Sequence, residues 1–195
     1  MGLRILDRKE QLTLTAIEII DELGIQNLTT RQIAKRQEIS EATLFRHFKN
    51  KKELLASVLD YFVQFDADIL HSTKLHNLTP TQALVYLISS YAEYYENYPA
   101  ISSILQIYNF LLYEEELADK MKEIQNNRTS AIQQMIEEAK LAGEISGNVD
   151  SNMVAVMITG FFREICFNWK TSNYEFSLSD RLLKTLELLL NALHD

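Results

Sequence analysis

Cysteine, proline and glycine are all scarce in this chain of 195 residues. Its one cysteine, Cys166, excludes an intramolecular disulfide framework, and we interpret it as a small buried apolar residue. Two prolines and five glycines are too few for a turn-rich β fold, and they favour helices joined by short connections. These scarcities predict an all-α protein.

Long hydrophobic runs are also missing. The stretch that comes nearest to one, "MVAVMITGFF" at 153–162, falls short of the roughly 20 residues that a membrane-spanning helix needs. The first residues, "MGLRILDRKEQ", lack the apolar centre of a signal peptide. We therefore expect a cytoplasmic protein with no membrane partner.

Positive charge is sparse overall but concentrated in one segment. The formal net charge is −8, yet residues 31–52 hold seven Lys or Arg against two Glu. A solvated helix face is the ordinary explanation of such a charge run. Here the basic residues lie within a helical pattern that turn signals interrupt, which favours contact with nucleic acid.

Four helices are predicted in the first part of the chain. An apolar stripe marks a helix over 8–23. Thr29 is predicted to cap a helix of about two turns, Ser40 a short helix over 41–47, and Asn50 a longer helix over about 51–70. Two short helices joined by about four residues and framed by a helix on each side form a helix-turn-helix, whose second helix enters the DNA major groove.

The segment "LTTRQIAKRQEISEATLFRHFKNKKELL" resembles the helix-turn-helix of the TetR family of transcriptional regulators, and the resemblance covers roughly residues 8–60. Its most specific part is "TLFRHFKNKKELL". The turn departs from the family pattern, because Gln37 and Glu38 stand where the family usually has Ala-Gly. A non-glycine residue there costs up to about 1–2 kcal/mol if its backbone is left-handed.

The predicted DNA contacts lie on and around the second short helix. Leu44 and Phe48 are expected to anchor this helix from behind, which leaves Arg46 and His47 on its other side. Lys51 begins the next helix, where its amide and its ammonium both suit a phosphate. The predicted DNA-binding residues are Thr30, Arg31, Ala42, Thr43, Phe45, Arg46, His47, Lys49 and Lys51.

Five further helices are predicted, over about 80–98, 101–113, 115–141, 151–169 and 178–193, which makes nine helices in all, the number that the resemblance implies. We divide the chain into a helix-turn-helix DNA-binding domain at 1–50 and a larger ligand-binding and dimerisation domain at 51–195. The helix over 51–70 connects them.

Two of these helices, at 153–169 and 178–193, are apolar on nearly every side. A helix without a polar face is buried on two sides, either in the middle of the domain or between the core and a second chain. Because a domain of this size is too small to bury both helices completely, we predict a two-fold homodimer through them.

An aromatic population lies between the connecting helix and these two helices, and eight of the nine tyrosines fall between residues 61 and 113. Aromatic residues at helical spacing are more often core, but a buried tyrosine hydroxyl needs a partner, which suits a cavity for a small hydrophobic effector. The predicted lining residues are Phe62, Phe65, Tyr91, Tyr95, Tyr108, Phe161 and Trp169. The segment "GEISGNVDSNMVAVMITGFFREICFNW" also bears a faint likeness to acyl-CoA-responsive members of the family.

Motifs of catalysis are missing as well. No Gly-rich phosphate loop, HExxH, CxxC or nucleophile elbow occurs, so we expect neither an enzyme nor a cofactor. Asp68 and His71 lie three residues apart on a predicted helix but lack the further ligands of a metal site, and no metal is predicted.

The resulting prediction is a ligand-responsive regulator, expected to be a repressor, that a small hydrophobic effector releases from a palindromic double-stranded DNA operator. Two alternatives remain open. One is an all-helical carrier of a hydrophobic ligand or lipid, whose basic segment touches a membrane. The other is a DNA-binding adaptor with a filled core and no effector.

Overall fold

The computed structural model describes residues 7–194, apart from the side chain of Asn109, and within this range all regular secondary structure is helical and no strand occurs. The prediction of an all-α fold is confirmed. The helices are α1 (Arg8–Leu23), η1 (Ile25–Asn27), α2 (Thr30–Arg36), α3 (Glu41–Phe45), α4 (Lys51–Leu75), α5 (Pro80–Asn97), η2 (Pro99–Leu105), α6 (Tyr108–Leu111), α7 (Glu115–Leu141), α8 (Ser151–Thr171) and α9 (Leu178–Ala192), of which η1 and η2 are 3₁₀ helices. Within the same range, none of the helices is long and apolar enough to cross a membrane.

Local sequence signals set the helix starts of the N-terminal part. The Thr29 hydroxyl accepts a hydrogen bond from the Gln32 amide at 3.2 Å, and the Ser40 hydroxyl accepts one from the Thr43 amide at 3.1 Å. The Asn50 side chain accepts from the Glu53 amide at 2.9 Å. The three predicted caps are confirmed, because each supplies an acceptor to an amide that has no partner within its own helix.

The predicted helix over 101–113 is wrong. That stretch divides into η2 and α6, with Gln106 and Ile107 between them. Every residue from Ile101 to Leu105 is buried, so the segment is enclosed on all sides and has no solvent face of the kind that an amphipathic α-helix keeps. Other bounds differ less: α3 ends at Phe45 rather than near 47, and α4 continues to Leu75.

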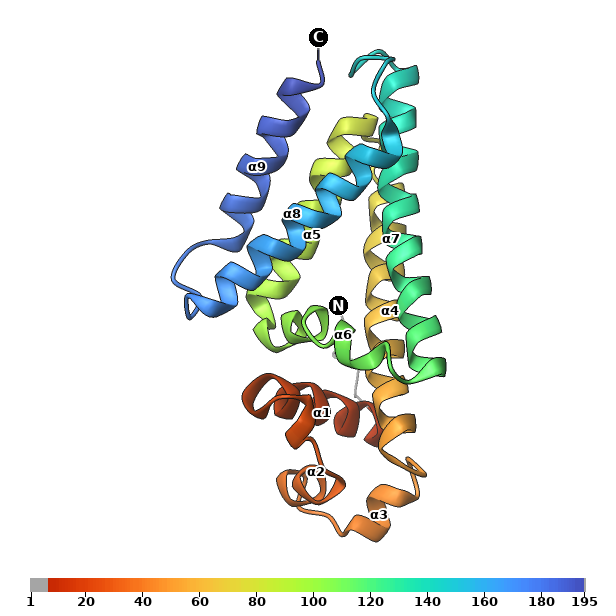
Figure 1. Cartoon of the computed structure of the whole chain (residues 1–195), viewed down its shortest axis with the longest axis vertical. Helices are drawn as coiled ribbons and strands as arrows, with labels where there is room; N and C mark the ends of the chain where they lie inside the picture. Colours follow the sequence, from red (N-terminus) through yellow and green to blue (C-terminus); the bar gives the residue numbers. More distant parts are fainter. Residues whose placement is uncertain (1–6, 195) are drawn as a thin grey trace.

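Figure 1 shows how the elements are arranged. Helices α1, α2 and α3 lie together at one end, and we call them the α1–α3 module. Helix α4 leaves this module and runs beside α5 and α7, while α8 packs against α7 and α9 packs against α5 and α8. The 3₁₀ helix η2 packs against α1 as well as against α5 and α8. One continuous set of buried side chains runs from α1 to α9, so the module is packed onto the larger part rather than tethered to it.

The turn between α2 and α3 is built from the two residues that depart from the family pattern. Glu38 adopts a left-handed backbone with φ of +52°. Gln37 joins the turn to α1, because Arg8 donates to the Gln37 side chain at 3.0 Å and to its carbonyl at 3.1 Å, and Gln37 donates to the Thr15 hydroxyl at 2.7 Å. These bonds hold the turn in place although the residue in the left-handed position carries a Cβ.

The left-handed backbone at Glu38 generates the first prediction. Glu38→Gly should raise the free energy of unfolding by about 0.5–1 kcal/mol. Removing a Cβ from this conformation removes a cost of about 1–2 kcal/mol, and the larger chain entropy that glycine loses on folding offsets part of this gain. Urea denaturation measures the change. Glu38→Ala is the matched control, since it removes the charge and keeps the Cβ; equal stabilisation by both variants would assign the effect to the charge instead.

Candidate nucleic-acid interface and ligand cavity

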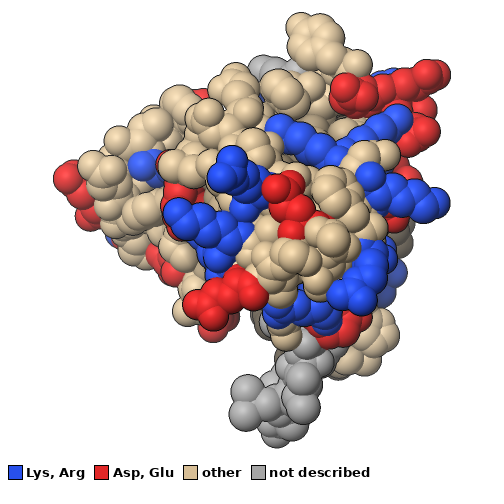
Figure 2. Space-filling view, turned by 90° about the horizontal axis from the view of Figure 1, so that it is seen from below, with Lys and Arg blue, Asp and Glu red and all other residues tan. Residues whose placement is uncertain are grey.

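The outer face of the α1–α3 module carries the predicted DNA-binding residues. Leu44 and Phe48 are buried behind this face, which orients α3. Arg31, Ala42, Phe45, Arg46 and Lys49 are exposed, and Thr30, Thr43, His47 and Lys51 are partly exposed. The structure therefore brings all nine to one end of the molecule, on α2, on α3 and around the start of α4, where Lys and Arg side chains gather with some Asp and Glu between them (Figure 2).

Several of these polar groups already have partners. The Thr30 hydroxyl donates to the Glu41 carboxylate at 2.9 Å, which links α2 to α3. Arg46 donates to the Thr43 hydroxyl at 3.1 Å, so its guanidinium lies along the exposed side of α3. These bonds are local and exposed, and they order the side chains that face outward.

Three of the seven basic residues of 31–52 serve the fold. Arg36 donates two hydrogen bonds to Glu22 of α1, at 2.6 and 2.8 Å, and this bonding lowers the pKa of the Glu22 carboxyl. Lys52 forms an ion pair with Glu116 of α7 at 2.9 Å. Lys51 donates from Nζ to the Ile25 carbonyl at 3.1 Å, and burial lowers the pKa of its ammonium.

The other four basic residues, Arg31, Lys35, Arg46 and Lys49, are exposed, and none of them forms an ion pair with a described residue. They are the cations that remain available to phosphates. This arrangement suits a polyanion, because the module presents free positive charge although the whole chain is acidic.

A cavity of about 380 Å³ lies in the larger part of the molecule, between α4, α5, η2, α7 and α8. Its wall is mainly apolar, with a few polar groups. The lining residues are Leu70, Leu87, Ile88, Tyr91, Leu105, Gln125, Arg128, Ile132, Val156, Ile158, Thr159, Gly160, Phe162 and Arg163. A hollow of about 620 Å³ between α5 and α9 is larger, but no residue of α4 lines it. Only the first of these two hollows therefore borders the helix that leads to the module.

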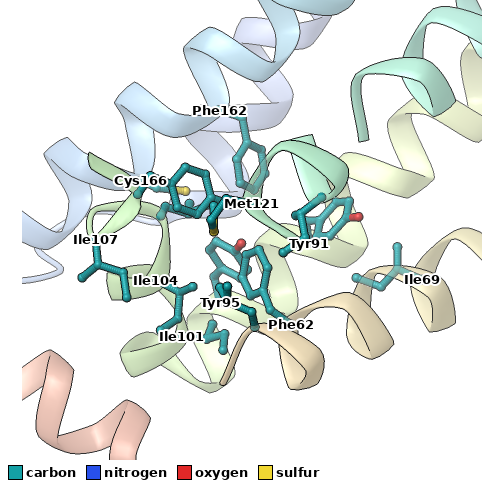
Figure 3. Close-up of a cluster of buried hydrophobic side chains, with 14 of the residues drawn as sticks. Phe62, Ile69, Tyr91, Tyr95, Ile101, Ile104, Ile107, Met121, Phe162 and Cys166 are labelled. Atoms are coloured by element: carbon teal, nitrogen blue, oxygen red, sulfur yellow. The ribbon is translucent and has the colours of Figure 1, made fainter. Parts of the chain in front are cut away.

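Of the seven aromatic residues predicted to line a cavity, Tyr91 lies in this wall. Phe62, Tyr95, Tyr108 and Trp169 are buried in the core, and Phe65 and Phe161 pack against it partly exposed. Figure 3 shows Phe62, Tyr91, Tyr95 and Phe162 within one cluster of buried side chains. Phe162, which the sequence reasoning did not select, lines the cavity and packs edge-on against both Tyr91 and Tyr95.

A buried ion pair lies at the cavity wall. Arg128 of α7 binds Asp66 of α4 through two contacts, Nε to Oδ2 and Nη2 to Oδ1, each of 2.5 Å. The two side chains are only 11% and 10% exposed. The guanidinium carbon lies 4.3 Å from the ring centre of Phe62 and 4.9 Å from that of Tyr91. Burial disfavours the charge, but Tyr95, Asp66 and Tyr91 together raise the pKa of Arg128 above its usual value.

Five tyrosines between residues 91 and 108 carry buried hydroxyls without a hydrogen-bond partner among the described residues; they are Tyr91, Tyr94, Tyr95, Tyr98 and Tyr108. Burial raises the pKa of each hydroxyl, in the case of Tyr108 to about 12, so all five stay neutral donors near pH 7. Burial also raises the pKa of the Cys166 thiol to about 12, and Cys166 is the small buried residue that the sequence predicted.

The sequence reasoning missed Asp66 and Arg128, although each leaves a signal. Asp66 follows Phe62 by four residues on the apolar stripe of α4, and Arg128 lies between Ile124 and Ile132 on that of α7. A charged residue on an otherwise apolar stripe must find a counter-charge inside the protein, because burying it alone is too costly. Two such residues of opposite sign, one on each helix, therefore indicate a pair.

Two family models match the chain. The family model described as "Bacterial regulatory proteins, tetR family" matches residues 12–58, and that described as "YsiA-like protein, C-terminal region" matches residues 60–192. The chain is 23% identical over 185 residues to the fatty acid metabolism regulator protein of Bacillus subtilis, covering 95% of both chains. It is 23% identical over 163 residues to the nucleoid occlusion factor SlmA of Vibrio cholerae, covering 82% of both.

Two solved structures share the fold over nearly the whole chain. The fatty acid degradation regulator FadR from Bacillus halodurans matches with a TM-score of 0.80 at 21% identity, covering 96% of each chain. The transcriptional regulator FadR from Bacillus subtilis, in complex with stearoyl-CoA, matches with a TM-score of 0.77 at 24% identity, covering 92% of this chain and 96% of that one.

The buried ion pair generates the second prediction. Asp66→Ala should lower the free energy of unfolding by about 3–5 kcal/mol, because it leaves the Arg128 guanidinium buried without its counter-charge. Lys184→Ala is the matched control: it breaks the exposed Lys184–Asp180 pair on α9, at 2.7 Å, and should cost less than about 1 kcal/mol. Urea denaturation measures the free energy of unfolding of both variants. If Asp66→Ala lowers this free energy no more than Lys184→Ala does, the structural role given to the buried pair is contradicted.

Proposed function

This chain belongs to the tetR family of bacterial regulatory proteins, and we propose that it acts as a repressor that leaves a palindromic DNA operator when a small hydrophobic effector fills its cavity. One observation carries this proposal. Helix α4 begins in the basic region beside the module, and further along it supplies Leu70 to the cavity wall and Asp66 to the ion pair. A single helix thus joins the surface for DNA to the site for a ligand.

Release of DNA follows from this connection. If a ligand favours a position of α4 that disfavours DNA binding, the ligand and DNA weaken each other's binding by the same factor, because coupling between two sites is reciprocal. The contact between η2 and α1 offers a second connection to the module. Asp21 of α1 forms an ion pair with Lys170 of α8 at 2.6 Å, and both are bonded to Ser103 of η2.

The effector class is proposed from the cavity and from the relatives together. The wall of the cavity is mainly aliphatic and aromatic, which suits an extended hydrocarbon chain. A structural relative with the same fold was solved in complex with stearoyl-CoA, and a sequence relative is a fatty acid metabolism regulator. An effector with an acyl chain accounts for both.

A homodimer through α8 and α9 completes the proposal. One side of α8 is buried in the core through Val154, Ile158 and Ile165, while its exposed side carries several apolar side chains beside Arg163 and Glu164. The exposed apolar side chains are Met153, Val156, Met157 and Phe167 on α8 and Leu188 on α9. A face of this kind is uncommon on a monomer, and joining two modules makes the second DNA contact intramolecular.

The third prediction tests DNA binding. Once duplexes bound from a random pool have defined an operator, Arg31→Ala should weaken binding to all duplexes alike and reduce the slope of log affinity against log salt by about one per half-site. The reason is that Arg31 is exposed on α2 and free of ion pairs with described residues. Lys184→Ala, at the far end of the molecule, should leave the slope unchanged. An unaltered slope in Arg31→Ala would remove this residue from the interface, and failure to select any duplex would refute the proposed function.

The fourth prediction concerns the dimer. Met157→Glu should give a folded monomer at micromolar concentration with weak operator binding, because Met157 is 54% exposed in the single chain and its replacement leaves the core intact. Leu186→Glu should unfold the protein instead, since Leu186 is fully buried within one chain. Sedimentation and circular dichroism separate the two effects. A Met157→Glu protein that stays dimeric would move the interface away from this face of α8.

A further inference from the structure

Two arginines face the cavity, and no Asp or Glu is found among the described residues that line it. Arg128 lies on α7, and Arg163 lies on α8 with its side chain largely exposed. Asp66 balances the charge of Arg128 from outside the wall. Arg163 has no ion pair with a described residue, so the cavity keeps about one unit of uncompensated positive charge.

Arg128 also has donors left over. A guanidinium carries five N–H groups in a fixed plane, and Asp66 accepts from only two nitrogens, Nε and Nη2. Within the described part of the chain, the Tyr91 hydroxyl is the other polar group that interacts with Arg128, and no hydrogen bond of standard geometry joins the two. The rings of Phe62 and Tyr91, 4.3 and 4.9 Å away, hold the guanidinium where it is. Buried donors without acceptors are costly, so a ligand atom that accepts from them is favoured.

A neutral donor lies beside these nitrogens. The Tyr91 hydroxyl is buried, lacks a hydrogen-bond partner among the described residues, and belongs to the same wall as Arg128. The remainder of the wall is apolar and includes Leu87, Ile132 and Phe162. The cavity therefore combines a hydrocarbon surface with a cluster of donors and a net positive charge.

This inference rests on the proposed function. We propose that the effector ends in a carboxylate, as a fatty acid does. Arg128 and Arg163 bind this carboxylate, and the apolar wall of the cavity holds the hydrocarbon chain. A carboxylate is planar, anionic and accepts two parallel hydrogen bonds, which matches the edge that a guanidinium presents. A neutral ester or thioester carbonyl offers one oxygen and no charge. The polar groups of the wall thus favour the free acid over its neutral derivatives.

This assignment also gives the ligand a means of acting on α4. A carboxylate bound to Arg128 competes with Asp66 for the same positive charge, and Asp66 belongs to α4. The bond that holds α4 against α7 becomes weaker when the ligand is present. Arg128 would then take part both in head group recognition and in release of DNA.

The experiment compares decanoate, methyl decanoate and decanoyl-CoA by isothermal titration calorimetry near neutral pH, on the full-length protein without DNA. Decanoate should bind at least about tenfold more tightly than methyl decanoate, the effect of a charge-assisted hydrogen bond. Equal affinity for these two probes overturns the proposal. Decanoyl-CoA should bind more weakly than decanoate, since its thioester is neutral.

Three variants locate the effect. Arg163→Gln should reduce the preference for decanoate several-fold without unfolding the protein, because this side chain is largely exposed. The double variant Asp66→Asn with Arg128→Gln keeps a neutral hydrogen-bonding pair in the core and should abolish most of the preference. Lys184→Gln, which is remote from the cavity, is the control and should leave the preference for decanoate unchanged. Thermal unfolding and sedimentation show that each variant is folded and keeps the oligomeric state of the wild type.

The outcomes are separable. A preference that survives both the Arg163 and the double variant overturns the assignment to these arginines. Tighter binding of decanoyl-CoA than of decanoate also overturns it, because the anionic group would then belong to the nucleotide part. All three probes are titrated without DNA, so a protein that prefers decanoate but selects no operator would refute the proposed function and leave this inference standing.

Discussion

The ion pair between Asp66 and Arg128 is the constraint on which the arrangement of the larger part depends. Two opposite charges can be buried between α4 and α7 only if the helices lie in one register, because a shift of either leaves both charges without a partner. Arg128 also contacts the rings of Phe62 of α4 and Tyr91 of α5, which extends this condition to α5. Packing of apolar side chains alone would tolerate small shifts of α4, whereas two contacts of 2.5 Å do not.

The basic segment divides its residues between folding and binding. Arg36 and Lys52 form ion pairs with Glu22 and Glu116, and Lys51 donates to the Ile25 carbonyl. These three residues therefore join α2 to α1 and the start of α4 to α7 and η1. The exposed cations that remain are few, and they lie on α2 and in the segment between α3 and α4. A module of this size offers limited contact with DNA. For this reason our proposal joins two copies of the module through the apolar face on α8 and α9.

How far the sequence predicted this structure depends on the range of the interaction involved. The caps at Thr29, Ser40 and Asn50 were predictable because each acceptor lies within three residues of the amide that it serves. The two-sided apolar character of α8 was predictable because it is a property of one helix. The helix expected over 101–113 was wrong because burial of 101–105 on all sides depends on α1 and α8, which lie far from it in the chain, as well as on the preceding α5.

By itself, then, the sequence determined the helices of the module, its resemblance to a family, the concentration of positive charge and the presence of an aromatic region, all of which arise from neighbouring residues. The tertiary structure alone decided which aromatic side chains border the cavity and which fill the core. It also brought Asp66 together with Arg128, which lie 62 residues apart in the chain. The physical reason is that helical periodicity shows which side of a helix faces inward, whereas the partner met there depends on how all the helices pack at once.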